Sequence, residues 1–252
     1  MDFDIKKPVH IFSLLLIEIT FLFVIILPII TFFFASGTVE SIDQYSDIPS
    51  SYRLIFEIFV LFFSLAFAVV LLIFFPLIWY FLVNNYNFKK TLSRLRLTFD
   101  KIYMALFWGI ITAIVIFGIT IVIGNIVISI FETNSQEMSN VPDLEALFSP
   151  VSLFLLVAIQ PIAEEFFFRG FLLDKFESLA GQNIAIISTA VLFGLAHASY
   201  GKLYPIVLPI IMGIVLAYVV IKTKNLYTAI IAHVCFNVGV LILTFLARSF
   251  VT

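Results

Sequence analysis

The chain has 252 residues, of which 62% are hydrophobic and only 12% are charged, whereas soluble globular domains carry about 25% charged residues. A water-soluble fold cannot hide so much apolar surface, so the composition excludes a soluble enzyme or binding module. The formal net charge of -2 and the lack of a long basic run give no reason to expect a nucleic-acid partner.

Apolar runs bounded by polar residues predict about seven membrane-spanning helices, since a hydrocarbon core of about 30 Å needs roughly 20 apolar residues per span. The runs are apolar on all faces, which excludes the two-residue alternation of a transmembrane barrel. The first run is too long for a signal-peptide core, and we read it as a retained span. The fifth is short and breaks at Ser199, so six to eight spans fit. The runs cover residues 10–34, 54–83, 102–131, 150–174, 183–199, 203–221 and 226–247.

Most Lys and Arg residues lie in every second connection between these runs, and therefore on one side of the membrane. Short cytoplasmic loops carry the excess of Lys and Arg. Stretches 36–52 and 132–150 contain acidic residues but no Lys or Arg, and we expect them to face outward. The sequence thus predicts an integral protein of the cell membrane with a cytoplasmic N-terminus. The residues assigned to the cytoplasmic face are Lys6, Lys7, Lys89, Lys90, Arg94, Arg96, Lys101, Lys175, Lys222 and Lys224.

Two adjacent carboxylates, Glu164 and Glu165, lie inside the fourth predicted span, where ionisable side chains are rare and usually functional. In a helix Glu165 and Arg169 share a face and can form an ion pair, whereas Glu164 is rotated by about 100° and lacks that partner. The two glutamates therefore have different expected roles. Glu165 with Arg169 braces helices, and Glu164 is available as a general base or acid. The alternative is that both glutamates only neutralise Arg169.

The later spans add two of the three histidines. His197 ends the run Phe193-Gly-Leu-Ala-His197, and His233 and Asn237 lie four residues apart, hence on one helical face. Depths counted at 1.5 Å per residue from the basic helix ends overlap with that of Glu164, in the cytoplasmic half or near the midplane. A lone histidine in a span is more often a satisfied polar contact, but four such groups together favour a site. The one cysteine, Cys235, excludes an internal disulfide and reads as a packing residue.

In this order the motifs resemble those of the CPBP (Abi) intramembrane peptidases, which include the type II CAAX prenyl endopeptidases and bacteriocin-processing and self-immunity proteins. The family patterns EExxxR, FxxxH and HxxxN stand here as Glu164-Glu165-x-x-x-Arg169, Phe193-x-x-x-His197 and His233-x-x-x-Asn237. The resemblance covers about residues 150–240. Since the sequence shows no internal repeat and no second domain, we expect a single all-α membrane domain, residues 1–252, with a three-span part at 1–149 and the family-like active-site core in the last four helices, 150–247.

The family also implies an intramembrane hydrolase. By resemblance, Glu164 and His197 activate water for attack on a peptide carbonyl, His233 and Asn237 stabilise the oxyanion, and Glu165, Arg169 and Phe193 support them. We expect no cofactor, with zinc as the alternative, because members are often called metalloproteases; its ligands would be Glu164, His197 and His233. The cavity should open to the cytoplasm or sideways to lipid, and the partners should be the bilayer and a peptide or membrane-protein substrate.

A rival interpretation is a membrane scaffold or bacteriocin immunity protein that uses the same polar residues to hold helices together. A transporter is disfavoured, since no matched broken helices or inverted repeats stand out. The substrate itself is not encoded in any readable motif. A prenylated CAAX tail, a secreted peptide precursor and a membrane protein all fit the pattern.

Overall fold

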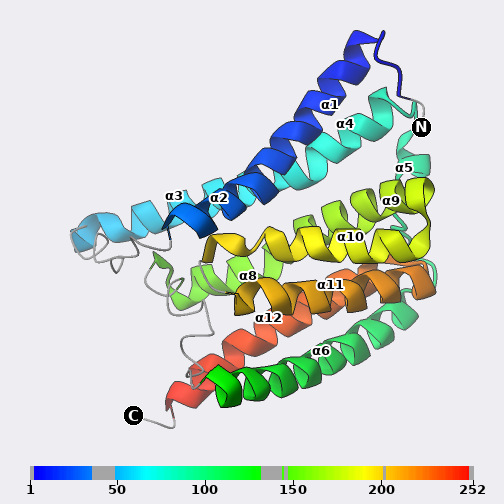
Figure 1. Ribbon diagram of the computed structural model, residues 1–252. Coiled ribbons are helices and arrows are strands. Elements are labelled where there is room, and N and C mark those ends of the chain that lie inside the picture. Colours follow the sequence, from blue (N-terminus) through cyan, green and yellow to red (C-terminus); the bar gives the residue numbers. More distant parts are fainter. Residues whose placement is uncertain (1–2, 36–48, 132–143, 145–146, 201–202, 250–252) are drawn as a thin grey trace.

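The computed structural model describes residues 3–35, 49–131, 144, 147–200 and 203–249, and every regular element within them is a helix (Figure 1). In these ranges six helices are long and apolar enough to cross a membrane, and Gln182–Leu195 is a shorter apolar helix. The prediction of an all-helical bundle of about seven spans is confirmed. The six long helices cover Pro8–Phe34, Tyr52–Leu82, Ile102–Ile130, Pro150–Ala180, Tyr204–Thr223 and Leu226–Ala247.

Two long antiparallel helices form the N-terminal layer. The first consists of α1 (Pro8–Phe21), a π-helical segment η1 (Leu22–Ile26) and α2 (Leu27–Ala35). The second consists of α3 (Ser50–Val69), a π-helical segment η3 (Val70–Phe74) and α4 (Phe75–Leu82). The two lie side by side along one edge of the molecule (Figure 1).

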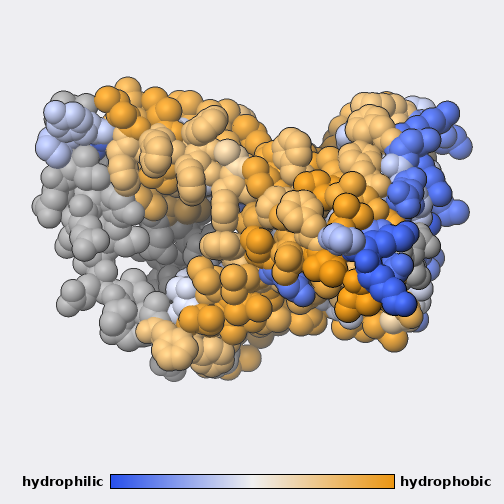
Figure 2. Space-filling model, turned by 90° about the horizontal axis from the view of Figure 1, so that it is seen from above, coloured by the Kyte–Doolittle hydropathy of each residue, from blue (hydrophilic) through white to orange (hydrophobic). Residues whose placement is uncertain are grey.

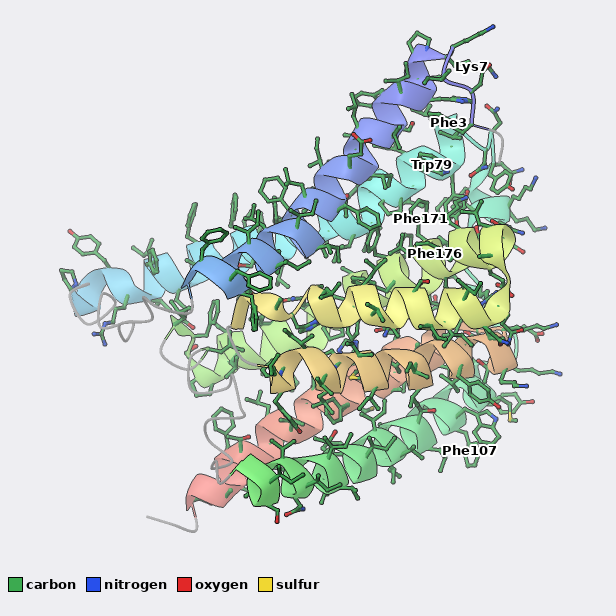
Figure 3. All side chains as sticks on the ribbon, in the orientation of Figure 1. Phe3, Lys7, Trp79, Phe107, Phe171 and Phe176 are labelled. Carbon is green, nitrogen blue, oxygen red and sulfur yellow. The ribbon has the colours of Figure 1, made fainter. Side chains whose placement is uncertain are left out.

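Aromatic rings join this layer to the rest of the bundle (Figure 3). Phe3 stacks on Trp79 with the ring centroids 5.8 Å apart, and Trp79 meets Phe171 edge to face at 6.4 Å. Tyr80 also packs its ring against Phe171, and its hydroxyl donates a 2.8 Å hydrogen bond to Asp174. The N-terminal layer is therefore anchored to the helix that carries the two glutamates.

The C-terminal core begins with a helix made of α8 (Pro150–Glu165), a π-helical segment η4 (Phe166–Leu172) and α9 (Leu173–Ala180). The chain turns at Gly181 into α10 (Gln182–Leu195). The φ of Gly181 is 81°, a conformation that would strain a residue with a side chain, so glycine is favoured at this turn. A 3₁₀ turn, η5 (Ala198–Tyr200), precedes α11 (Tyr204–Thr223). Lys224, at a φ of 54°, then reverses the chain into α12 (Leu226–Ser249).

The end of the bundle that carries the α11–α12 turn is held together by short polar contacts. Helix α5 (Phe88–Arg94) lies there, followed by the long α6 (Ile102–Phe131), which packs along α12 (Figure 1). The backbone N–H of Leu226 donates to the Arg96 carbonyl at 2.9 Å, and Asn225 Nδ2 donates to the Thr98 carbonyl at 3.1 Å. These bonds fix where α12 begins, and therefore how deep His233 lies.

The surface distribution agrees with a membrane protein. Figure 2 shows hydrophobic residues over the middle of the face in view, and hydrophilic residues gathered at the end where the N-terminus and α5 lie. The basic residues named above belong to this end, which we call the basic end: they lie before α1, between α4 and α6, in α9 and around the α11–α12 turn.

Candidate active site

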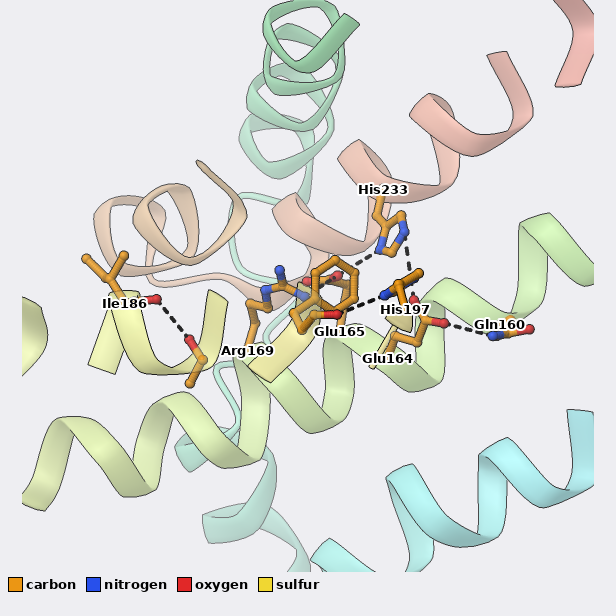
Figure 4. A network of polar contacts seen from close by, with 9 residues as sticks. Gln160, Glu164, Glu165, Arg169, Ile186, His197 and His233 are labelled. Atoms are coloured by element: carbon orange, nitrogen blue, oxygen red, sulfur yellow. Dashed lines mark hydrogen bonds and ion pairs between the residues drawn. The ribbon is translucent and has the colours of Figure 1, made fainter. Parts of the chain in front are cut away.

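Glu165 is the centre of a buried charge cluster. Its Oε1 accepts hydrogen bonds from Arg169 Nη1 at 2.9 Å and from His233 Nδ1 at 2.8 Å (Figure 4). The side chains of Glu165 and Arg169 are fully buried. The predicted ion pair between Glu165 and Arg169 is confirmed. The same Glu165 oxygen also accepts a hydrogen bond from His233 of α12, a contact that was not predicted.

Glu164 lies one residue earlier but in different surroundings. It is near the middle of the Pro150–Ala180 helix, and its side chain is 12% exposed. Gln160 Nε2, one turn earlier, donates to Glu164 Oε1 at 2.8 Å, and His233 Nε2 lies 3.9 Å from Glu164 Oε2 (Figure 4). As expected from the helical spacing, the Arg169 hydrogen bond goes to Glu165 and not to Glu164.

His197 lies just beyond the end of α10, and its Nδ1 is 2.8 Å from the Phe193 carbonyl oxygen. A carbonyl oxygen only accepts, so this contact requires a proton on Nδ1. In the neutral ring, Nε2 is then the proton-accepting nitrogen. The same argument holds for His233, because its Nδ1 faces Glu165 Oε1, a carboxylate oxygen that also accepts from Arg169.

Phe193 forms the apolar wall between these polar groups. Its ring is 1% exposed and meets His197 at 4.9 Å and His233 at 5.7 Å, both edge to face. The Arg169 guanidinium carbon lies 4.1 Å from its centroid, which adds a cation–π attraction at a buried position. The aromatic ring at this position thus packs against Arg169, His197 and His233.

Glu164, His197, His233 and Asn237 all line one cavity of about 510 Å³. They come from α8, the end of α10 and α12, so the structure brings all three motifs to the same space. Further wall residues come from α6 and α11, which the motifs do not include. Cys235 is exposed, on a different face of α12.

The cavity extends from the polar cluster toward the end of the bundle opposite the basic end. Its walls include Leu153 near the start of α8, Ile128 near the end of α6 and Thr244 near the end of α12. The described walls thus do not extend to the basic end, and the expectation that the cavity opens to the cytoplasm or sideways to lipid stays a prediction. The depths counted from the sequence show how far each residue lies from the basic end of its helix. They do not show which half of the bundle is tightly packed, and so they could not predict the direction of the cavity.

A zinc site was the alternative expectation. The donor chemistry is suitable, because both imidazoles have Nδ1 held by an acceptor and Glu164 supplies a carboxylate. Among the residues that the structure describes, however, no group of three His, Cys, Asp or Glu side chains is arranged so that it could hold a metal ion. This arrangement does not fit a three-ligand metal site.

Gln160 and the cavity walls were not predicted from the sequence. Gln160 is four residues before Glu164, so the helical spacing that pairs Glu165 with Arg169 would also have found this contact. The wall residues are ordinary Leu, Val, Pro and Thr side chains, which carry no signal in one sequence.

The fold and this cluster define a polytopic helical membrane protein with a buried glutamate–histidine site. Residues 146–239 match the family model described as type II CAAX prenyl endopeptidase Rce1-like. This segment contains all three motifs, so the resemblance seen in the sequence is confirmed. At the level of the family, the match supports a CAAX-type intramembrane protease. Comparison with curated proteins and with solved structures gave no match.

Proposed function

We propose that this protein is an intramembrane endopeptidase, which hydrolyses a peptide bond of a membrane-associated peptide or protein. The observation that carries the proposal is the convergence of Glu164, His197, His233 and Asn237 on one cavity. Amide hydrolysis needs a base beside the attacking water and donors where negative charge develops, and these side chains supply both.

The first step uses Glu164 with His197. The Glu164 carboxylate, or the Nε2 lone pair of a neutral His197, accepts a proton from water as the water oxygen attacks the carbonyl carbon. The π electrons of that carbonyl move to its oxygen. When the tetrahedral intermediate collapses, the C–N bond breaks, and the same group returns the proton to the leaving amine. Gln160 keeps the Glu164 carboxylate in position through its 2.8 Å hydrogen bond.

The second requirement is a donor for the oxyanion. Asn237 supplies an amide N–H₂ without titrating. His233 can donate from Nε2 only when its ring is doubly protonated, because Nδ1 already donates to Glu165 at 2.8 Å. The buried Glu165 carboxylate orients the His233 ring through this bond, which gives the Glu165–Arg169 brace a second task beside holding helices.

The main alternative function is that of a membrane scaffold. The different surroundings of Glu164 and Glu165 distinguish the two functions. Polar residues that only hold helices together are expected to be paired, as Glu165 is with Arg169 on its own helix and with His233 on α12. Glu164 instead faces a cavity and is partly exposed. An ionisable group placed at an open space inside an apolar bundle favours a chemical task over a structural one.

Zinc-dependent hydrolysis remains the alternative mechanism, and Glu164, His197 and His233 would be its ligands. We favour the metal-free route, since the described donors are not arranged around one ion. The proposed partners are accordingly the bilayer and a peptide or membrane-protein substrate. The proposed location is the cell membrane with the basic end in the cytoplasm.

The test is a peptide comparison by mass spectrometry between strains that carry and lack this protein. Full-length precursors should accumulate in the deletion strain, and their cleaved products should return on complementation with the wild type. Glu164→Ala and His197→Ala should not restore the products, although they should be expressed and be nearly as stable in detergent. Full restoration by either variant would end the enzyme proposal in favour of a scaffold.

A further inference from the structure

Three helices give the direction of the cavity independently. On α8 its walls run from Glu164 back to Leu153, and on α12 they run from His233 forward to Thr244. Eleven residues at 1.5 Å each make both stretches about 16 Å long. On α6 only Thr120 and later wall positions, up to Ile128, take part. In each case the cavity occupies the half of the helix that points away from the basic end.

The other half of the bundle is close-packed. Arg169, Phe168, Leu173, Leu216 and Leu226, which lie between the polar cluster and the basic end, are at most 1% exposed. A Cβ added at Gly213 would lie 2.9 Å from the Ala190 Cα and 3.2 Å from Arg169 Nη2. No peptide could reach Glu164 from the basic end without displacing these side chains.

The cavity walls also limit what can bind. The ionisable side chains among its described wall residues are Glu164, His197, His233 and Tyr204, and none is Lys or Arg. Among these described residues a free C-terminal carboxylate would find no permanent cation, although carboxylates in apolar sites need one. The remaining walls are mainly apolar, as at Leu156, Val157 and Leu241, which suits an apolar stretch within a chain.

From these observations we propose that the substrate enters from the face opposite the basic end, as an apolar segment within an exported or membrane-anchored peptide. The inference rests on the proposed peptidase function and specifies its substrate class. Because short cytoplasmic loops carry the excess positive charge, the basic end faces the cytoplasm and the cavity faces outward. A cytoplasmic tail that ends in a free carboxylate would be on the wrong side.

Accessibility of single cysteines tests the direction without using activity. In a Cys235→Ser background, Thr120→Cys places a thiol deep in the cavity, and Ile121→Cys, beside it, places one on the lipid-facing side, where Ile121 is 62% exposed. Lys89→Cys marks the basic end. The reagent is a membrane-impermeant methanethiosulfonate, applied to intact cells and to inverted membrane vesicles.

Thr120→Cys should react at least tenfold faster in intact cells than in inverted vesicles, Lys89→Cys should show the reverse, and Ile121→Cys should react in neither. Thr244→Cys repeats the test at the wall position of α12 that lies farthest from the basic end, and the exposed neighbour Leu243→Cys is its lipid-facing control. Reaction of the cavity cysteines from the same side as Lys89→Cys, or from neither side, would overturn the proposal. An added Glu164→Gln substitution should leave the labelling unchanged. The labelling therefore tests the side of entry, and the peptidase assay tests the catalytic function, so that either proposal can fail without the other.

The substrate class is tested with two reporters. Each has one transmembrane anchor and the same apolar test segment, placed on the outer side in one reporter and on the cytoplasmic side in the other. The outer reporter should be cut in cells with the wild-type protein and left intact in cells with Glu164→Gln. Cleavage of the cytoplasmic reporter alone would reverse the assignment.

Discussion

Loss of the Glu165 carboxylate should destabilise the protein far more than loss of the neighbouring Glu164. Glu165→Ala leaves the fully buried Arg169 guanidinium without its ion-pair partner and His233 Nδ1 without its acceptor. Removing one member of a buried ion pair costs about 3–5 kcal/mol, because the other charge stays buried. Glu164 is partly exposed and accepts one hydrogen bond, from Gln160, so Glu164→Ala should cost about 1 kcal/mol.

The assay is reversible unfolding in mixed micelles with increasing sodium dodecyl sulfate, followed by tryptophan fluorescence. A double variant, Glu165→Leu with Arg169→Met, removes both charges and should recover most of the lost free energy, since no buried charge is left unpaired. The reasoning is refuted if Glu165→Ala unfolds together with Glu164→Ala, or if the double variant is no more stable than Glu165→Ala.

Three further predictions concern the oxyanion donor, helix packing and metal dependence. Asn237→Ala should lower kcat about 10²–10³-fold with little change in KM. The control Asn125→Ala, on the exposed face of α6, should leave kcat unchanged. Equal rates for the two variants would show that Asn237 is not part of the site. Gly194→Ala should cost about 1–3 kcal/mol in the micelle assay, because its Cβ would lie 2.6 Å from the Ile206 carbonyl oxygen, whereas Gly118→Ala meets nothing within 4 Å and should not destabilise. Metal chelators should leave the cleavage rate of purified protein unchanged, and loss of activity that added zinc restores would favour the metal route.

The sequence predicts those features of the fold that depend on composition and local spacing. Long apolar runs specify helices because the bilayer leaves the backbone few other solutions. The Glu165–Arg169 pair and the shared face of His233 and Asn237 follow from a helical period of 3.6 residues, whatever the rest of the chain does. The short α10 was also foreseeable, because its run is too brief to cross alone.

Contacts between helices could not be predicted in this way. The bond from His233 to Glu165 joins residues 68 positions apart, and it depends on how α12 is held by Arg96 and Asn225. The direction of the cavity depends on which half of the bundle is close-packed, a property of many apolar side chains at once. The π-helical segment after Glu165 has no marker in the sequence either, although such segments are common at functional sites.

The most direct measurement is the cleavage of a precursor peptide by purified protein in lipid vesicles, with products identified by mass spectrometry. Wild-type protein and Glu18→Gln, which makes the same substitution at an exposed position of α1, should produce two fragments whose masses sum to that of the precursor plus one water. Glu164→Gln should produce neither fragment while it unfolds at the same detergent concentration as the wild type. Fragments formed at the wild-type rate by Glu164→Gln would contradict the claim that this carboxylate activates the water.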